Sequence, residues 1–210
     1  MRYSSISVPS TFPPSRRPIH IHPIAEMTKK HKDTAWPKVA SALDQVIGRH
    51  PQDRILVHTV SYDLNRYLLS ALTGPSRLVS YNTSSEKQRA IDRYIYTPAS
   101  VLLAPSLDRG IDLPGDDCRV IVVCKIPFPN LGDKQVSARL HSPGGQLWYN
   151  VRTVRSLVQM TGRGMRSEND QCDSYILDAS FMTSIWRKSR NLLPEWWRDA
   201  VNLQARPLGV

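Results

Sequence analysis

The sequence has few cysteines and few glycines, and these two shortages exclude several kinds of site. Its three cysteines, Cys118, Cys124 and Cys172, are odd in number and have no CxxC spacing. A disulfide framework and a zinc or iron–sulfur site are therefore not predicted, and a reducing, cytoplasmic location is expected. None of the ten glycines is followed by lysine, so the phosphate-binding loop G-x-x-x-x-G-K-[ST] is absent from these 210 residues.

Long apolar runs are absent as well. No run approaches the roughly 18 residues that a bilayer-spanning helix needs. The first residues, MRYSSISVPSTFPPSRRP, contain no apolar core of a signal peptide. We therefore expect a soluble protein without a membrane partner.

Positive charge, by contrast, is in excess. The chain has 28 lysines and arginines against 18 aspartates and glutamates, which gives a formal net charge of +10. Such a balance favours a polyanionic partner such as nucleic acid, although a basic surface also serves solubility.

The length and hydrophobic content predict one domain with loose ends. A chain of 210 residues, of which 40% are hydrophobic, can bury one full core. Residues 1–18 hold four prolines among serines, which predicts an extended linker. We expect the main domain to cover residues 19–190, and a short amphipathic helix with a frayed tail to cover residues 191–210.

Short apolar runs alternate with helical patterns from Ile19 onward. Strands are expected in IHIHPI, ILVHTV, RLVSYN, SVLLAPS, CRVIVVCKI and DSYILD. Helices are expected from about Trp36, with Pro37 in the first turn, in SYDLNRYLLSAL and in SSEKQRAIDRYIY. The segment 131–149 is interrupted by proline and two glycines, so a helix followed by a loop is expected there. The alternation predicts βαβ units and a three-layer α/β/α fold with a mostly parallel sheet.

The loops after three of these strands are the expected ligand-binding loops. In an open parallel sheet, ligands bind outside the carboxyl ends of the strands, here after ILVHTV, SVLLAPS and CRVIVVCKI. The loop SLDRGIDLPGDD holds two glycines, a proline and four aspartates. Gly110 would let the backbone approach a ligand, and Asp112 could accept from a hydroxyl or a metal-bound water. An ordinary β-to-helix loop is the alternative.

The stretch QMTGRGMRSEND combines a glutamine and two arginines with two glycines. A helical count places an apolar stripe against the sheet and a second row on the opposite face, made of Arg152, Arg155, Gln159, Arg163 and Arg166. A solvated basic face would explain the charge. However, Gly162 and Gly164 each cost a helix about 1 kcal/mol relative to alanine, so we expect something to pass close to the backbone there. Arginine also grips phosphate with two parallel hydrogen bonds, which lysine cannot do.

These residues carry a resemblance to a known family. Gln159, Gly162, Arg163 and Arg166 fill every defined position of Q-x-x-G-R-x-x-R, which resembles the sixth motif of superfamily 2 helicases. SLDRGIDLPGD resembles the fifth motif of the DinG/XPD-like branch, and ILVHTVSYDL looks like the fourth. The phrases STFPPSRRPI, KIPFPNLGD and SYILDASF extend the match from about residue 10 to residue 181. The resemblance implies the second RecA-like motor domain of a DNA helicase.

For ATP, the resemblance implies a site shared between two domains. A first RecA-like domain, in cis or in trans, would supply the phosphate loop and the acidic magnesium motif, so ATP and Mg²⁺ would be bound jointly. Arg163 and Arg166 would act as arginine fingers, and Gln159 would hold a phosphate or the network of the attacking water. Gly110, Asp112, Gly162 and Ser106 would bind nucleotide or couple it to DNA. Arg109 departs from the family pattern, in which an acidic residue usually precedes the glycine.

For DNA, the resemblance implies contacts with a single strand. Thr59, Ser61 and Tyr62 would meet the sugar–phosphate backbone, while Ser61 or Asp63 caps the following helix. No iron–sulfur cluster is expected in this chain. Two alternatives stay open: a non-catalytic nucleic-acid-binding module derived from a split or decayed helicase, and a nucleotide-binding protein of metabolic type. The lack of a glycine fingerprint after the first strand argues against the second alternative.

Overall fold

A parallel sheet of seven strands forms the centre of the chain. The computed structural model describes residues 10–106 and 113–209. The strands are β1 (Ile19–Ala25), β2 (Ile55–His58), β3 (Leu78–Ser80), β4 (Val101–Ala104), β5 (Val120–Val123), β6 (Asp173–Asp178) and β7 (Val201–Asn202). Their order is β3-β4-β2-β5-β6-β1-β7, and all neighbouring strands run parallel. The predicted α/β class and the six predicted strands are confirmed.

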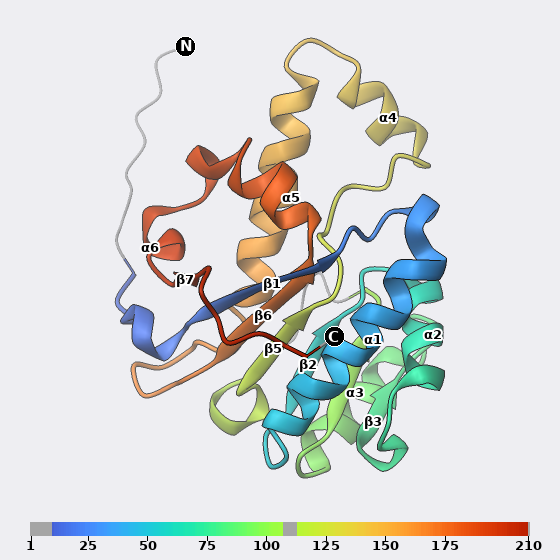
Figure 1. The fold of residues 1–210 in the computed structure, drawn as a ribbon, viewed down its shortest axis with the longest axis vertical. Helices are drawn as coiled ribbons and strands as arrows, with labels where there is room; N and C mark the ends of the chain where they lie inside the picture. The colour runs from blue at the N-terminus through green and yellow to red at the C-terminus, as the bar shows by residue number, and fades with distance from the viewer. Residues whose placement is uncertain (1–9, 107–112, 210) are drawn as a thin grey trace.

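Helices cover both faces of this sheet (Figure 1). They are α1 (Lys32–Arg49), α2 (Tyr62–Ala71), α3 (Lys87–Tyr96), α4 (Lys134–Leu140), α5 (Gly145–Thr161) and the short α6 (Glu195–Arg198). α1 and α2 pack on one face, and α3 and α5 pack on the other. Because β2, β4 and β5 are buried along their whole length, their side chains alternate between two apolar cores.

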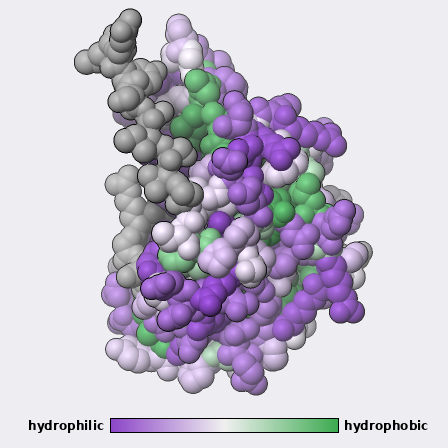
Figure 2. Space-filling model, turned by 90° about the vertical axis from the view of Figure 1, so that its left-hand side faces the viewer, coloured by the Kyte–Doolittle hydropathy of each residue, from purple (hydrophilic) through white to green (hydrophobic). Residues whose placement is uncertain are grey.

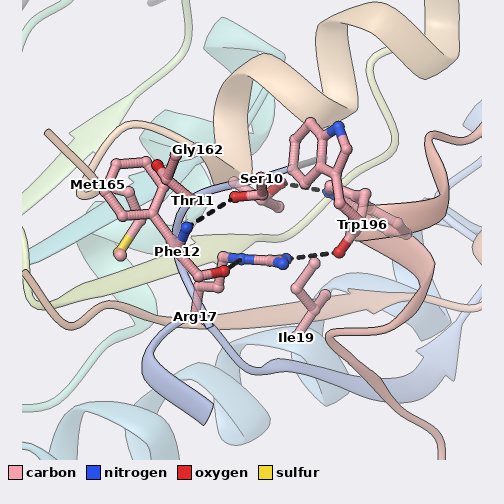
Figure 3. A pocket seen from close by; sticks show the side chains of 10 residues that line it. Ser10, Thr11, Phe12, Arg17, Ile19, Gly162, Met165 and Trp196 are labelled. Carbon is pink, nitrogen blue, oxygen red and sulfur yellow. Dashed lines mark hydrogen bonds between the residues drawn. The ribbon is translucent and has the colours of Figure 1, made fainter. Parts of the chain in front are cut away.

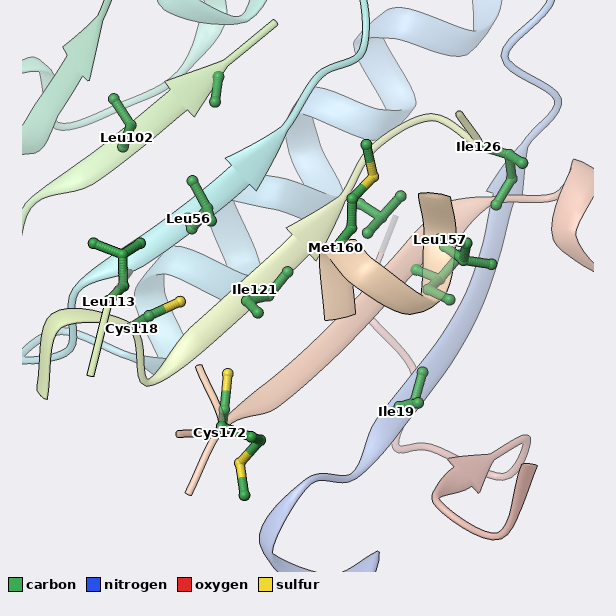
Figure 4. Packing of buried hydrophobic residues seen from close by; sticks show 14 of the residues in the cluster. Ile19, Leu56, Leu102, Leu113, Cys118, Ile121, Ile126, Leu157, Met160 and Cys172 are labelled. Carbon is green, nitrogen blue, oxygen red and sulfur yellow. The ribbon is translucent and has the colours of Figure 1, made fainter. Parts of the chain in front are cut away.

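The core on the α5 side fixes the position of that helix. Leu56 of β2 and Ile121 of β5 face Leu157 and Met160 of α5 in this core, as Figure 4 shows. All four side chains are at most 6% exposed. The end of α5 and the loop after it are therefore held close to the sheet.

Two helix boundaries differ from the prediction. α1 begins at Lys32, so Pro37 lies inside the helix rather than in its first turn. Ala35 is buried against the sheet, which holds the turn before Pro37 in helical form. The expected loop before residue 149 is a tight corner instead, because Gly144 adopts a left-handed conformation (φ 74°) and α5 begins at once with Gly145.

The C-terminal segment packs against the domain. The sequence pattern missed β7, which extends the sheet next to β1, where the Ile19 amide donates to the Ala200 carbonyl at 2.8 Å. Further on, Arg49 donates to the Pro207 carbonyl at 2.8 Å, and Leu208 is buried. The domain boundaries at residues 18 and 190 stay predictions.

The surface is largely polar. Figure 2 shows one face on which hydrophilic residues predominate and apolar ones form small patches. Among the helices in the described ranges, none is both long enough and apolar enough to cross a membrane.

Candidate functional site

The two motif arginines lie in a loop and not on the helix. α5 ends at Thr161, and Gly162 leaves the helical conformation with its amide donating to the Val158 carbonyl at 3.1 Å. The predicted row on one helix face is therefore wrong for Arg163 and Arg166. The Arg163 side chain is only 6% exposed, whereas Arg166 is exposed.

Gly164 marks the close approach that the sequence predicted, but the neighbour is the chain itself. A Cβ at Gly164 would lie 2.5 Å from Cys172 Sγ and 2.8 Å from Cys172 Cβ, and it would also clash with the Cys118 carbonyl oxygen. Both cysteines are buried next to the sheet. Gly162 has a different role, because it ends the helix and its added Cβ would meet only the Val158 carbonyl at 3.2 Å.

Asp170 closes the loop that carries Arg166. One of its carboxylate oxygens accepts from the amides of Arg166 and Ser167, each at 2.7 Å. Burial alone would raise the pKa of Asp170, but these hydrogen bonds outweigh it, so the pKa is lowered. The Arg166 guanidinium donates to the carbonyls of Gly162 (3.1 Å) and Met165 (3.0 Å). The loop is thus fixed by its own backbone before any ligand arrives.

The N-terminal segment packs beside this loop. Arg16 donates to the Glu168 carbonyl, and the Cys172 amide donates to the Arg16 carbonyl at 2.9 Å. Figure 3 shows Arg17 between Phe12 and Trp196, whose carbonyls accept from it at 2.9 and 2.6 Å. These residues line an apolar pocket of about 290 Å³ that also reaches Gly162.

A second, polar cleft of about 420 Å³ opens at the carboxyl ends of β2, β4 and β5. The sequence predicted a ligand site after these three strands. The cleft brings two predicted residues together: the Tyr62 hydroxyl lies 3.3 Å from Ser106 Oγ. Its wall is completed by α4, α5 and the loop after β5, through residues that include Asn130, Asp133, Val136, Arg152, Ser156 and Met160.

Thr59, which was predicted to contact DNA, is fully buried. Its hydroxyl donates to Asn65 Oδ1 at 3.1 Å. Ser61 caps α2 as predicted, since its side chain accepts from the Leu64 amide. Asn65 was not predicted from the sequence; it is a buried residue whose amide also donates to Ser80 Oγ at 2.6 Å. One sign in the sequence could have indicated this role: Asn65 is a polar residue on the apolar side of the amphipathic helix α2.

His58 was also missed. It ends β2, lines the cleft and is only 1% exposed. Among the described residues, neither of its ring nitrogens has a hydrogen-bond partner. Burial, and secondarily the charge of Arg163, lowers its pKa to about 3. His58 is therefore neutral at physiological pH, and it lies between the cleft and the motif loop.

The remaining predicted residues are not gathered into one site. Gln159 is exposed on α5. Arg109, Gly110 and Asp112 lie outside the described residues. Within residues 10–106 and 113–209, no group of three or more histidines, cysteines or carboxylates could hold a metal ion.

Comparison with known families agrees with this arrangement. Residues 43–200 match the Helicase C-terminal domain. This chain therefore belongs to that family and is a C-terminal helicase domain of the XPD/DinG branch. The resemblance inferred from the motifs is confirmed.

Individual relatives are longer than this chain. ATP-dependent DNA helicase XPD of Sulfolobus acidocaldarius is 25% identical over 186 residues, which is 80% of this chain and 33% of that protein. ATP-dependent helicase DinG of Mycobacterium tuberculosis is 30% identical over 108 residues, or 48% of this chain and 16% of that protein. A solved Xpd structure of S. tokodaii superposes with a TM-score of 0.62 at 16% identity, covering 90% of this chain and 38% of that one. The chain thus spans a third or less of the length of these curated relatives, and the RecA-like fold class is confirmed.

Proposed function

We propose that this domain supplies Arg163 and Arg166 to an ATP site shared with a first RecA-like domain, and that its polar cleft binds single-stranded DNA. The observation that carries the proposal is the motif loop after α5. Asp170 and Gly164 fix this loop, and the loop presents Arg166 at the surface. The chain also belongs to a helicase family.

The chemistry of an arginine pair suits a triphosphate. A guanidinium is always charged and donates two parallel hydrogen bonds to phosphate oxygens. ATP would supply the hydrolysable triphosphate, and the two arginines would donate to its oxygens as negative charge grows there. A finger of this kind accelerates phosphoryl transfer about 10³- to 10⁵-fold. Arg166 is the exposed member, while the buried Arg163 lies behind it and next to His58.

The other ATP-related assignments are part of the same proposal. Gln159 would hold a phosphate or the attacking water's network from the exposed face of α5. Gly110 and Asp112, with Ser106 and Gly162, would couple nucleotide to DNA. Mg²⁺ would be held mainly by the first domain, because the described residues offer no carboxylate cluster for it.

The cleft offers the groups that a DNA backbone needs. The Tyr62 and Ser106 hydroxyls and the Arg152 guanidinium line the cleft and can contact phosphates without reading sequence, and Ser61 would contribute from the adjacent turn. Thr59 would act indirectly, because its hydroxyl is committed to Asn65 and fixes the turn that carries Ser61.

Reconstitution with a matching first domain tests the proposal. The chain alone should hydrolyse no ATP, and the mixture should show turnover that DNA stimulates. Arg163→Ala and Arg166→Ala should abolish this turnover, whereas Arg89→Ala, an exposed arginine of α3, should not. Full turnover in both motif variants would contradict the finger assignment. Binding of DNA without turnover under any pairing would instead favour a non-catalytic module.

A further inference from the structure

The helical hairpin beside the cleft stands clear of the domain. We define the arm as residues 130–155, which contain α4 and the first turns of α5. Figure 1 shows both elements projecting beyond the sheet. α4 has no buried residue, although an ordinary surface helix buries one face. The arm therefore offers a surface that the described part of the domain does not cover.

This surface is strongly basic. Residues 130–155 contain four lysines and arginines but a single carboxylate, Asp133. That carboxylate caps α4, where it accepts from the amides of Gln135 (2.8 Å) and Val136 (3.3 Å). The arm thus has no free acidic group that could neutralise its cations.

Two of these cations are gathered on one ring. The guanidinium carbons of Arg139 on α4 and Arg152 on α5 lie 5.8 and 5.6 Å from the centre of the Trp148 ring. Within the described part of the chain, neither arginine forms an ion pair. Stacking on an indole holds a guanidinium in place while its N–H edge stays available for phosphate. Two like charges held together in this way match an anionic partner with repeated charges.

The arm is continuous with the cleft. Arg152, Ser156 and Met160 line the cleft from successive turns of α5. Tyr149, next to Trp148, stacks on Phe128 of the cleft wall, with ring centres 6.0 Å apart and planes 10° from parallel. A chain of phosphates that leaves the cleft past Arg152 would meet Trp148 and Arg139 next.

From this geometry we infer that the arm binds the single strand where it leaves the cleft. Arg139 and Arg152 contact successive phosphates, and Trp148 is a positioning residue that holds both guanidiniums. The inference rests on the proposed DNA-binding function and adds a second contact surface to it. A single strand fits better than an apolar protein surface because the pair is cationic and has no carboxylate partner among the residues that the structure describes.

The test measures binding of fluorescent oligothymidylate, about 20 nucleotides long, by anisotropy over a series of salt concentrations. Each phosphate contact with a single strand contributes about 0.7 to the slope of log affinity against log salt. Arg139→Gln and Arg152→Gln should each lower that slope by about this amount and weaken binding about three- to tenfold. Arg155→Gln is the matched control, because it removes an exposed cation of the same helix that does not line the cleft.

Substitutions of Trp148 test its positioning role, because they leave the charge of the arm unchanged. Trp148→Leu keeps every cation, yet it should lower the salt slope as the arginine variants do, because the guanidiniums are no longer held. Trp148→Phe retains an aromatic ring and should restore most of the slope. Circular dichroism would confirm that each variant is folded.

Three outcomes would overturn the inference. Equal losses in the Arg139, Arg152 and Arg155 variants would show diffuse attraction and no site. Unchanged binding in all of them would show that the arm does not contact the strand. An unchanged slope in Trp148→Leu would remove the positioning role. Two measurements separate the arm from the proposed DNA-binding function. If the wild-type chain does not bind the oligothymidylate, DNA binding as a whole is refuted. If Tyr62→Leu weakens binding while the arm variants do not, only the role of the arm is refuted.

Discussion

Replacing Gly164 with alanine should destabilise the domain and displace the motif loop. The added Cβ would lie 2.5 Å from Cys172 Sγ, whereas real Cβ atoms essentially never approach another heavy atom closer than 3.0 Å. It would also clash with the Cys118 carbonyl. Cys118 and Cys172 are 0% and 1% exposed, so neither can move aside into solvent. The loop itself must therefore move away from the sheet.

The magnitude follows from this overpacking. Forcing an extra methyl into a packed site costs typically about 1–3 kcal/mol. For a chain of this size, each kcal/mol lowers Tm by about 2–4 °C, so a fall of about 2–12 °C is expected. A loop displaced by about 1 Å could also lower reconstituted ATP turnover about 100-fold.

Gly162→Ala is the matched control on the other side of Arg163. Its Cβ would meet only the Val158 carbonyl at 3.2 Å, and its φ of −91° suits any residue. We expect a change in unfolding free energy within about 1 kcal/mol. Thermal unfolding followed by circular dichroism compares the two variants. Equal Tm values would refute the assigned role of Gly164.

Two further predictions concern buried polar groups of the cleft. Folding lowers the pKa of His58 from 6.5 to about 3, so as the pH falls this imidazole is protonated in the unfolded chain before it is protonated in the folded one. The contribution of neutral His58 to stability is therefore complete above pH 6.5 and is lost as the pH falls towards 3. At pH 5 this loss amounts to about 2 kcal/mol, and urea titrations at pH 7 and pH 5 should show a smaller loss in His58→Leu; an equal loss in both proteins would contradict the assignment. Asn65→Leu leaves the hydroxyls of Thr59 and Ser80 without their amide partner and should cost about 1–3 kcal/mol in the same assay. The exposed Asn191→Leu should stay within about 0.5 kcal/mol, and a similar small change for Asn65→Leu would show that its hydrogen bonds are unimportant.

The strands and the class of fold could be predicted because burial on both faces leaves uninterrupted apolar runs. Ile121, Val122 and Val123 form such a run and are all fully buried. β7 could not be predicted in this way. It has only two residues, and it is a strand because the chain returns to pair Val201 with Ile19, a contact that no local pattern encodes.

The candidate site was predictable in part. The motif spacing singled out the two arginines but placed them on a helix, and the sheet rule placed the cleft that joins Tyr62 and Ser106. The helical period continues through Met165, however, so the prediction extended the helix past Gly162 although the two glycines disfavour it, and it did not foresee that Arg163 is buried. Tertiary packing against Cys118 and Cys172 decides this, and it is not readable from residue spacing.

The role of Arg166 is tested most directly by steady-state ATP hydrolysis in the reconstituted pair of domains. Arg166 is exposed, so its replacement by alanine should leave the fold intact and report on chemistry. We predict that kcat falls by about 10³-fold or more while KM for ATP changes less than about tenfold, because the contact forms mainly in the transition state. A kcat within about tenfold of the wild type would contradict the proposal that this loop delivers an arginine finger.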